Sequence, residues 1–291
     1  MNAVIVNRSR RQARGLALLL LAAMMLLAGA LATQARAANY VGLGDSYAAG
    51  PLIPNQSLEP LGCLRSDHNY AHLAAPSLGL PLKDPSCSGA KTNNMTESQS
   101  VEFGTNPPQF NSLSSETSVV SITIGGNDIG FSEVAQSCIT INPFSTPCRD
   151  KYTAGGKDQL AERIAATAPK VAAVLQGIHT RAPSAKIYVL NYPAIFPETG
   201  IGCWPQMPIG FGDVSYLRST EQGLNKMLAT QAAANGATVV DWYKASIGHD
   251  ACKSSSNRWV EPLIPGELAA PIHPNKAGMQ GGANALIAAA K

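Results

Sequence analysis

The sequence predicts an α/β fold, a three-layer sandwich in which helices cover both faces of a central parallel sheet of about five strands. The first observation is the run VVSITI at residues 119–124. It is continuously β-branched or apolar, as in a parallel strand that is covered on both faces. The second observation is that such runs alternate with stretches of helical periodicity, which is typical of parallel sheets.

The predicted elements follow one another without a boundary for a second domain. The first strand ends in Gly44-Asp45-Ser46, where an apolar run meets a turn. Two long loops, 196–213 and 243–271, follow the last two strands and should lie at the carboxyl edge of the sheet. We expect further strands at 80–87, 114–127, 186–191 and 237–242, helices at 67–79, 157–181, 215–235 and 276–290, and a disulfide-closed excursion at 131–152.

The first 37 residues have the composition of a secretory signal peptide. Basic residues from Arg8 to Arg14 precede an apolar run at 15–32, and Ala35-Arg36-Ala37 then provides a small-residue cleavage site. An uncleaved membrane anchor is the alternative, because the run approaches the length of a membrane span. We expect residues 1–37 to be removed and residues 38–291 to be one secreted domain with no stable membrane span.

The charge of the mature chain gives no reason to expect a nucleic-acid partner. The whole chain has 22 basic and 19 acidic residues, a net charge of +3. The leader contains five arginines and no acidic residue, so 17 basic residues face 19 acidic ones after its removal, a net charge of −2. The apparent basicity therefore belongs to the leader.

All six cysteines lie in the predicted mature chain: Cys63, Cys87, Cys138, Cys148, Cys203 and Cys252. An even number of cysteines in an exported chain predicts three disulfides, for which sequence alone allows about 15 pairings. No pair has the Cys-x-x-Cys spacing of a zinc or redox site.

Four short patches form the candidate site. Gly44-Asp45-Ser46 places a hydroxyl at the end of the first strand, where open α/β sheets hold their ligands. The other patches are Ser88-Gly89-Ala90, Gly125-Gly126-Asn127-Asp128 and Ile272-His273-Pro274-Asn275. A serine, a histidine and neutral hydrogen-bond donors are what acyl transfer requires.

These four patches, in this order, resemble the blocks of the SGNH hydrolases, the GDSL lipase/esterase family. The resemblance spans Gly44 to Asn275 and is greatest to secreted, disulfide-bonded members. It implies a flavodoxin-like sheet of order 2-1-3-4-5 and a monomeric carboxylic-ester hydrolase that needs no metal or cofactor. It also implies disulfides Cys63–Cys87, Cys138–Cys148 and Cys203–Cys252.

The resemblance assigns a role to each residue of the site. Ser46 would be the nucleophile and His273 the base. The backbone N–H groups of Ser46 and Gly89 and the side-chain amide of Asn127 would form the oxyanion hole. Asp45 is interpreted as a helix cap or a residue that fixes the loop, not as the acid of a triad.

The sequence departs from the family pattern at Ala270, where most members have the aspartate that orients the histidine. The imidazole still needs an acceptor for its second N–H, because that bond fixes the tautomer that can act as base. We expect a backbone carbonyl near Ala270 or Pro271 to accept it, giving a Ser-His dyad. The alternative is a remote carboxylate, Glu267, Glu261 or Asp250.

Two other interpretations of the motifs are weaker. An α/β-hydrolase needs Gly-x-Ser-x-Gly, and position 48 is Ala48. His68 and His72 are four residues apart on a predicted helix, but no third metal ligand is evident, so a solvated helix face is favoured.

Acyl lipids are the first expectation for the substrate, because the two long loops are rich in large apolar residues that could line an acyl pocket. Alternatively, these residues only pack the loops against the sheet. Phospholipase activity, polysaccharide O-acetyl esterase activity and an inactive secreted binding module also remain open. The apolar loop residues are Trp204, Met207, Ile209, Phe211, Trp242, Tyr243 and Trp259.

Overall fold

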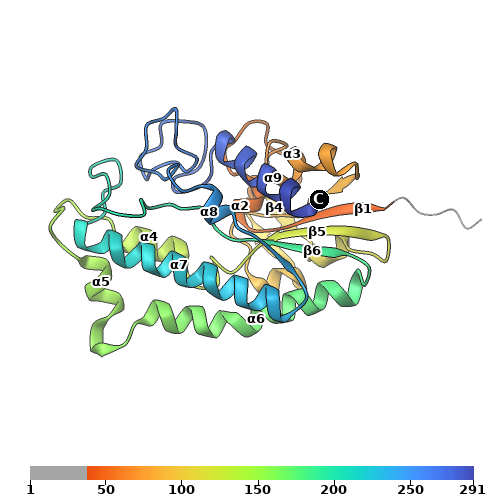
Figure 1. Cartoon of the computed structure of the whole chain (residues 1–291), viewed down its shortest axis with the longest axis horizontal. Helices are drawn as coiled ribbons and strands as arrows, with labels where there is room; N and C mark the ends of the chain where they lie inside the picture. The colour runs from red at the N-terminus through yellow and green to blue at the C-terminus, as the bar shows by residue number, and fades with distance from the viewer. Residues whose placement is uncertain (1–37) are drawn as a thin grey trace, which may run out of the picture. The chain divides into compact units, whose positions relative to one another are not determined.

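A five-stranded parallel sheet lies at the centre of the computed structural model, which describes residues 38–291 (Figure 1). Its strand order is β2-β1-β5-β6-β7, and every neighbouring pair is parallel, as the predicted order 2-1-3-4-5 requires. The strands are β1 (Asn39–Gly44), β2 (Leu82–Lys83), β5 (Thr117–Thr123), β6 (Lys186–Leu190) and β7 (Thr238–Val240).

Helices cover both faces of this sheet, which confirms the three-layer arrangement. Helix α3 (Tyr70–Leu78) packs beside α9 (Lys276–Ala290) on one face, and α6 (Gln159–Arg181) packs beside α7 (Phe211–Ala234) on the other (Figure 1). Four shorter helices lie near the carboxyl edge: α2 (Ser46–Ala49), α4 (Phe131–Ser137), α5 (Pro147–Tyr152) and α8 (Trp242–Ala245).

The smaller elements are local. A hairpin of β3 (Gln99–Val101) and β4 (Gly104–Asn106) projects from the domain, and its exposed strands carry no apolar run by which the sequence could have predicted them. Short 3₁₀ turns are formed by Leu61–Cys63, Thr92–Met95, Gln109–Ser112 and Ala154–Gly156.

Three elements differ from their predicted bounds. The strand expected at 80–87 is reduced to β2, because Pro81 and Pro85 flank it and lack the N–H that a ladder needs. The excursion at 131–152 contains α4 and α5. Helix α7 begins four residues before 215, because the buried carboxylate of Asp213 accepts hydrogen bonds from the N–H groups of Cys148 and Arg149 at 2.9 Å each. This tertiary contact overrides the low helix propensity of Gly212.

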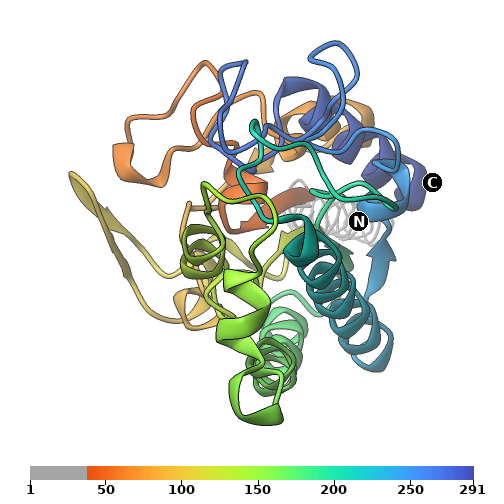
Figure 2. The same ribbon diagram turned by 90° about the vertical axis from the view of Figure 1, so that its left-hand side faces the viewer.

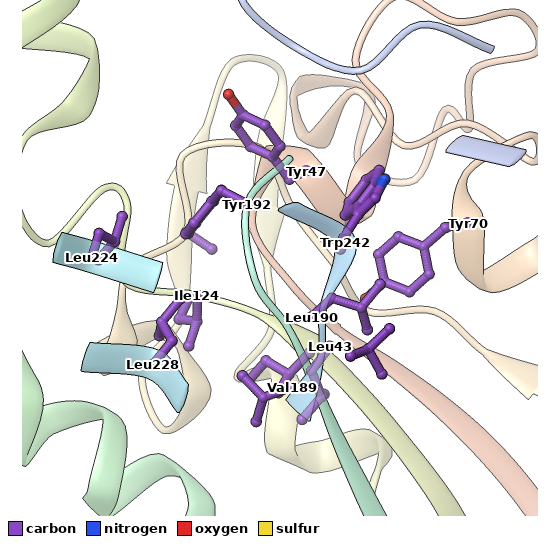
Figure 3. Close-up of a cluster of buried hydrophobic side chains, with 14 of the residues drawn as sticks. Leu43, Tyr47, Tyr70, Ile124, Val189, Leu190, Tyr192, Leu224, Leu228 and Trp242 are labelled. Atoms are coloured by element: carbon purple, nitrogen blue, oxygen red, sulfur yellow. The ribbon is translucent and has the colours of Figure 1, made fainter. Parts of the chain in front are cut away.

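Helix α8 packs closely on α3 and α9. Trp242 is completely buried, and its ring meets that of Tyr70 at 71° with a centroid distance of 5.8 Å (Figure 3). Gly282 of α9 makes room for the indole, since a Cβ at this position would lie 2.9 Å from the ring. This close packing of α8 on α9 uses an aromatic residue that the sequence suggested as a pocket residue.

The disulfides link the segments at the carboxyl edge. Cys63 is bonded to Cys87, Cys138 to Cys148 and Cys203 to Cys252, the pairing that the family resemblance implies. The third bond joins the two long loops, which gather with the 138–147 segment on the face turned to the viewer in Figure 2. Among residues 38–291 no cysteine is free.

The signal peptide predicted for residues 1–37 lies outside the described residues. Within residues 38–291, no helix has both the length and the apolar character that crossing a membrane demands.

We predict that Ile122→Ala lowers the free energy of unfolding by about 2–5 kcal/mol. Ile122 is fully buried in β5, the middle strand, so its truncation leaves a cavity between the two helix layers. Urea unfolding of the described domain measures the effect. The control is Ile141→Ala, whose side chain is 95% exposed and which should change stability by less than about 0.5 kcal/mol. Equal stabilities for the two variants would contradict the assignment of this core.

Candidate active site

The turn after β1 holds Ser46 at the carboxyl edge of the sheet. Gly44 has φ +141°, and a Cβ there would lie 2.6 Å from the carbonyl oxygen of Thr123, so the turn requires glycine. Ser46 is the first residue of α2 and its side chain lies at the edge of a pocket. The Gly-Asp-Ser motif therefore ends a buried strand, as predicted.

Gln109 fixes this turn from outside the strand. Its side chain donates to the carbonyl of Gly44 and accepts from the N–H of Gly44, both at 2.8 Å. Both backbone groups of the residue that ends β1 are thereby satisfied inside the protein. The contact of Gln109 with Gly44 could not be predicted from the sequence, because Gln109 lies in a short 3₁₀ turn outside any recognised motif.

Asp45 joins the ends of three strands. Its buried carboxyl accepts hydrogen bonds from Tyr47 N at 3.0 Å, Thr123 Oγ1 at 2.9 Å and Tyr192 Oη at 2.5 Å. Tyr192 Oη also accepts from Gly126 N at 2.8 Å. Burial raises the pKa of Asp45 to about 6, and these hydrogen bonds oppose the rise. Asp45 is the N-cap of α2, in agreement with its interpretation as a cap.

The structure brings His273 and Ser46 together although 227 residues separate them. The Nε2 atom of His273 lies 2.8 Å from Ser46 Oγ, and Nδ1 lies 2.8 Å from the carbonyl oxygen of Pro271. Burial lowers the pKa of His273, and the hydrogen bond to Pro271 opposes this effect. A neutral imidazole with Nδ1–H donating to the carbonyl leaves Nε2 free to accept the serine proton.

Two of the three carboxylates considered as remote partners are engaged elsewhere. Glu261 is fully buried and forms a bidentate ion pair with Arg258 at 2.9 and 2.7 Å, and it also accepts from Asn275 Nδ2 at 2.9 Å. Asp250 lies 3.7 Å from Lys253 Nζ and accepts from Cys252 N. The Nδ1 atom of His273 is hydrogen-bonded to Pro271 and to none of the three carboxylates.

The Glu261 ion pair and its neighbours hold the loop that carries His273. Glu261 N donates to His273 O at 3.0 Å, and Ile272 N donates to Glu261 O at 2.9 Å. Tyr47 Oη donates to Ile272 O at 2.6 Å, so the neighbour of the serine is bonded to the neighbour of the histidine. These bonds fix the position of the imidazole relative to α2.

Asn127 and Gly89 lie on the same side of Ser46. Cys87 N donates to Gly44 O at 3.1 Å, which brings the 87–90 segment to the end of β1. Gly89 has φ +79°, a conformation that favours glycine. Asn127 lines the pocket with Ser46 and His273, and its Nδ2 donates to Ala90 O at 3.0 Å. The segments that carry the four predicted patches thus converge, although Gly89 itself is not among the residues that line the pocket.

The pocket that starts at Ser46 is mainly apolar. Met207 and Ile209 of the first long loop line it, as the sequence suggested. The sequence missed the larger part of the wall, which comes from helices α4 and α7 and from the segment after β6. Its further apolar lining residues are Ile129, Phe131, Val134, Ala135, Tyr192, Ile195, Phe196, Leu217, Leu224, Leu263 and Ile272.

The five other apolar residues suggested for the pocket do not line it. Trp242 packs between helices, Trp259 stacks on His249 at 4.3 Å, and Phe211 meets Phe144 edge to face at 5.6 Å. Tyr243 accepts a hydrogen bond from Gln222, and Trp204 donates to Thr140. Large rings fill the spaces between segments here, so the expectation was wrong for these residues.

One carboxyl, Glu221 of α7, is buried in the pocket wall. Its Oε1 accepts from Ile195 N at 3.0 Å, and Oε2 has no hydrogen-bond partner in the described part of the chain. Burial raises the pKa of Glu221 well above its ordinary value. Burial thus favours the neutral form of this carboxyl, whereas the hydrogen bond from Ile195 N favours the ionised form.

The two histidines predicted to share a helix face do not do so, because α3 begins at Tyr70 and His68 precedes its N-cap Asn69. His72 Nδ1 lies 3.4 Å from Asp84, and His68 contacts Asp67. Within residues 38–291, no group of three or more histidine, cysteine or carboxylate side chains is arranged to hold a metal ion.

Comparison with known proteins identifies the family. Residues 43–280 match the model of the GDSL-like lipase/acylhydrolase family. "Lipase 2" of Streptomyces coelicolor is 38% identical over 246 residues, 82% of this chain and 81% of its own. "Lipase 1" of the same organism is 31% identical and covers 91% of this chain and 92% of its own.

Solved structures agree with these relatives. Phospholipase A1 from Streptomyces albidoflavus superposes with a TM-score of 0.74 at 27% identity, over 87% of this chain and 99% of its own. The extracellular lipase from Streptomyces rimosus gives 0.67 at 27% identity, over 87% of this chain and 100% of its own. The chain therefore belongs to the GDSL-like lipase/acylhydrolase family and is a carboxylic-ester hydrolase.

Proposed function

We propose that the protein is a secreted lipase or esterase that cleaves acyl lipids through an acyl-enzyme on Ser46. The observation that carries the proposal is the 2.8 Å contact between Ser46 Oγ and His273 Nε2 at one end of an apolar pocket. A serine hydroxyl becomes a nucleophile when a neighbouring base accepts its proton. The mainly apolar walls of the pocket favour a hydrocarbon chain as the bound group.

The reaction follows from this geometry. Ser46 Oγ attacks the ester carbonyl while its proton passes to His273 Nε2, and the imidazolium then protonates the leaving alcohol. A water molecule next gives a proton to His273 and attacks the acyl-serine, and the imidazolium returns that proton to Ser46 Oγ as the acid is released. No step requires a metal or cofactor.

The negative charge that develops on the carbonyl oxygen needs hydrogen-bond donors. We assign this role to the N–H groups of Ser46 and Gly89 and to the side chain of Asn127. One amide hydrogen of Asn127 is directed to Ala90 O, and the second is available to the substrate. The bond to Ala90 also holds the amide in place before the substrate arrives, which favours preorganised stabilisation.

The orienting group of His273 is, in this proposal, the carbonyl of Pro271. It is two residues away in the chain and 2.8 Å from Nδ1. A neutral carbonyl fixes the tautomer as a carboxylate does, but it gives less electrostatic support to the imidazolium that forms during the reaction. Ser46 and His273 thus form a dyad.

Three disulfides support secretion, because such bonds form and persist in oxidising compartments. We expect the exported protein to begin at Ala38 and to act as a monomer without a nucleic-acid partner. N-terminal sequencing of the exported protein and light scattering test these expectations.

Phospholipase activity is the second candidate, because a solved phospholipase A1 shares the fold at 27% identity over nearly its full length. An O-acetyl esterase of polysaccharides would not need a long apolar pocket. An inactive binding module would have no use for the Ser46–His273 contact.

We predict that Ser46→Ala lowers kcat/KM for p-nitrophenyl butyrate by at least about 10⁴-fold, because the nucleophile is lost. Asn127→Ala should lower kcat by about 100- to 1000-fold. The control is Ser132→Ala, another serine on the pocket wall, which should retain activity. The assay is repeated with phosphatidylcholine, a long-chain triglyceride and acetylated xylan. Turnover that survives Ser46→Ala would overturn the proposed function.

Replacing Glu267, Glu261 and Asp250 singly by their amides should change kcat by less than about tenfold, because the Pro271 carbonyl orients the base. Glu261→Gln also weakens a buried ion pair, so its thermal stability is measured beside its turnover. A thousandfold loss of kcat in a variant that remains folded would show that a carboxylate serves as the third member.

The pH dependence of kcat/KM provides a separate check on the dyad. The base must be neutral to accept a proton, and burial lowers the pKa of His273. Activity should therefore persist below pH 6.5 and decline only as the pH falls through this lowered pKa. A nearby carboxylate would raise the pKa of the imidazole. An acid limb with its midpoint above pH 6.5 would contradict the assignment.

A further inference from the structure

Large apolar side chains are exposed on the loops that wall the pocket. Ile141 is 95% exposed and Phe144 82%, and even the most covered member of this set, Trp204, is 38% exposed. Exposed apolar groups gathered on one surface mark an interaction site more often than isolated ones do. We call the following six residues the apolar rim: Ile139, Ile141, Phe144, Trp204, Ile264 and Leu268.

Hydrogen bonds between the loops place these residues on one surface. Thr140 N donates to Pro208 O at 2.8 Å, and Trp204 Nε1 donates to Thr140 O at 3.3 Å. Ile264 N donates to Gln206 O at 3.3 Å, which joins the loop that carries Ile264 and Leu268 to the loop that carries Trp204. Figure 2 shows the three segments on the face toward the viewer, beyond the carboxyl ends of the strands.

Two of the loops that carry the rim also line the pocket. Met207 and Ile209 line the pocket from the loop that carries Trp204. Leu263 lines it too, while the next residue, Ile264, is 61% exposed. Neighbouring residues of one loop therefore face the interior and the solvent, and an apolar surface leads from outside the molecule toward Ser46.

The rim loops contain almost no charge. Residues 138–146 and 199–210 have no charged side chain, and residues 262–272 have only Glu267. No lysine or arginine is present there to attract anionic headgroups, and the electrostatic attraction on which peripheral binding to anionic lipid relies is missing. This composition favours a surface of neutral or zwitterionic lipid.

Disulfides brace the same loops. Cys138–Cys148 closes the loop that carries Ile139, Ile141 and Phe144, and Cys203–Cys252 fastens the loop that carries Trp204. Cross-linked loops lose less conformational freedom on binding than free ones, which lowers the entropic cost of docking.

From these observations we propose that the apolar rim docks on the surface of aggregated neutral or zwitterionic lipid and delivers an acyl chain into the pocket. This inference deepens the proposed function, because it adds where the substrate is taken from. Apolar side chains that lie in the boundary between headgroups and acyl chains hold a protein at a membrane surface.

The test uses the double variant Ile141→Ser/Leu268→Ser. The two positions lie on different rim loops, neither lines the pocket, and both side chains are largely exposed. Binding is measured by co-sedimentation with phosphatidylcholine vesicles, on proteins that also contain Ser46→Ala so that the vesicles stay intact. We expect vesicle binding to fall at least about tenfold, since two exposed apolar anchors are removed.

Activity is measured on the same double variant with Ser46 in place. Hydrolysis of vesicle phosphatidylcholine or of an emulsified triglyceride should fall about as far as binding does. Hydrolysis of monomeric p-nitrophenyl butyrate should stay within about twofold, because the soluble ester reaches the pocket without docking. Thermal unfolding of the double variant should match that of the unmodified protein.

The matched control is Phe103→Ser, at the exposed turn of the β3–β4 hairpin outside the rim loops. Phe103 is 77% exposed, so this control also removes a large exposed apolar side chain, yet vesicle binding should not change. Equal loss of binding in this control would overturn the assignment of the docking surface to the rim.

Three results would overturn the inference. The first is unchanged vesicle binding by the double variant, and the second is binding that requires anionic lipid. The third is a dimer in light scattering that the double variant converts to monomers, since a second copy would then cover the rim. Failure of this inference can be distinguished from failure of the proposed function, because binding is measured on Ser46→Ala protein and does not depend on turnover.

Discussion

The buried carboxyl of Asp45 is the interaction on which the geometry of the site depends. It receives hydrogen bonds from α2, from the end of β5 and from Tyr192 just after β6, so three neighbouring segments meet at one side chain. Leaving such donors unpaired inside the protein would cost about 1–3 kcal/mol each. Asp45 thus fixes the distance between β1, which leads to Ser46, and β5, which leads to Asn127.

Ser46 and His273, the proposed catalytic residues, are held in different ways. Ser46 is set by the sheet, through Gly44, Asp45 and the Gln109 side chain. His273 is set by a loop, whose order comes from the buried Glu261–Arg258 pair and from Tyr47. The Glu261 carboxylate therefore stabilises the loop that carries His273. The imidazole itself is hydrogen-bonded to a backbone carbonyl, that of Pro271. This division explains how the chain can lack an acid at Ala270.

The sequence predicted the features that are formed by adjacent residues, but not those that depend on how distant residues pack together. Gly44-Asp45-Ser46 and His273-Pro274-Asn275 could be recognised because a turn and a cap are built from adjacent residues. The pocket wall could not be recognised from the sequence, because Leu217 and Leu224 follow the same helical spacing as residues that only fill the core. Trp242 and Trp259 were misassigned because the sequence does not indicate the side on which a large ring packs.

The long separation of the two reacting groups along the polypeptide has a consequence for biosynthesis. Ser46 is synthesised well before His273, because 227 residues separate them and His273 lies just before α9. Domains acquire their long-range contacts only when the partner segments have been made. A nascent chain that has not yet reached residue 273 therefore contains the Ser46 hydroxyl without the imidazole beside it.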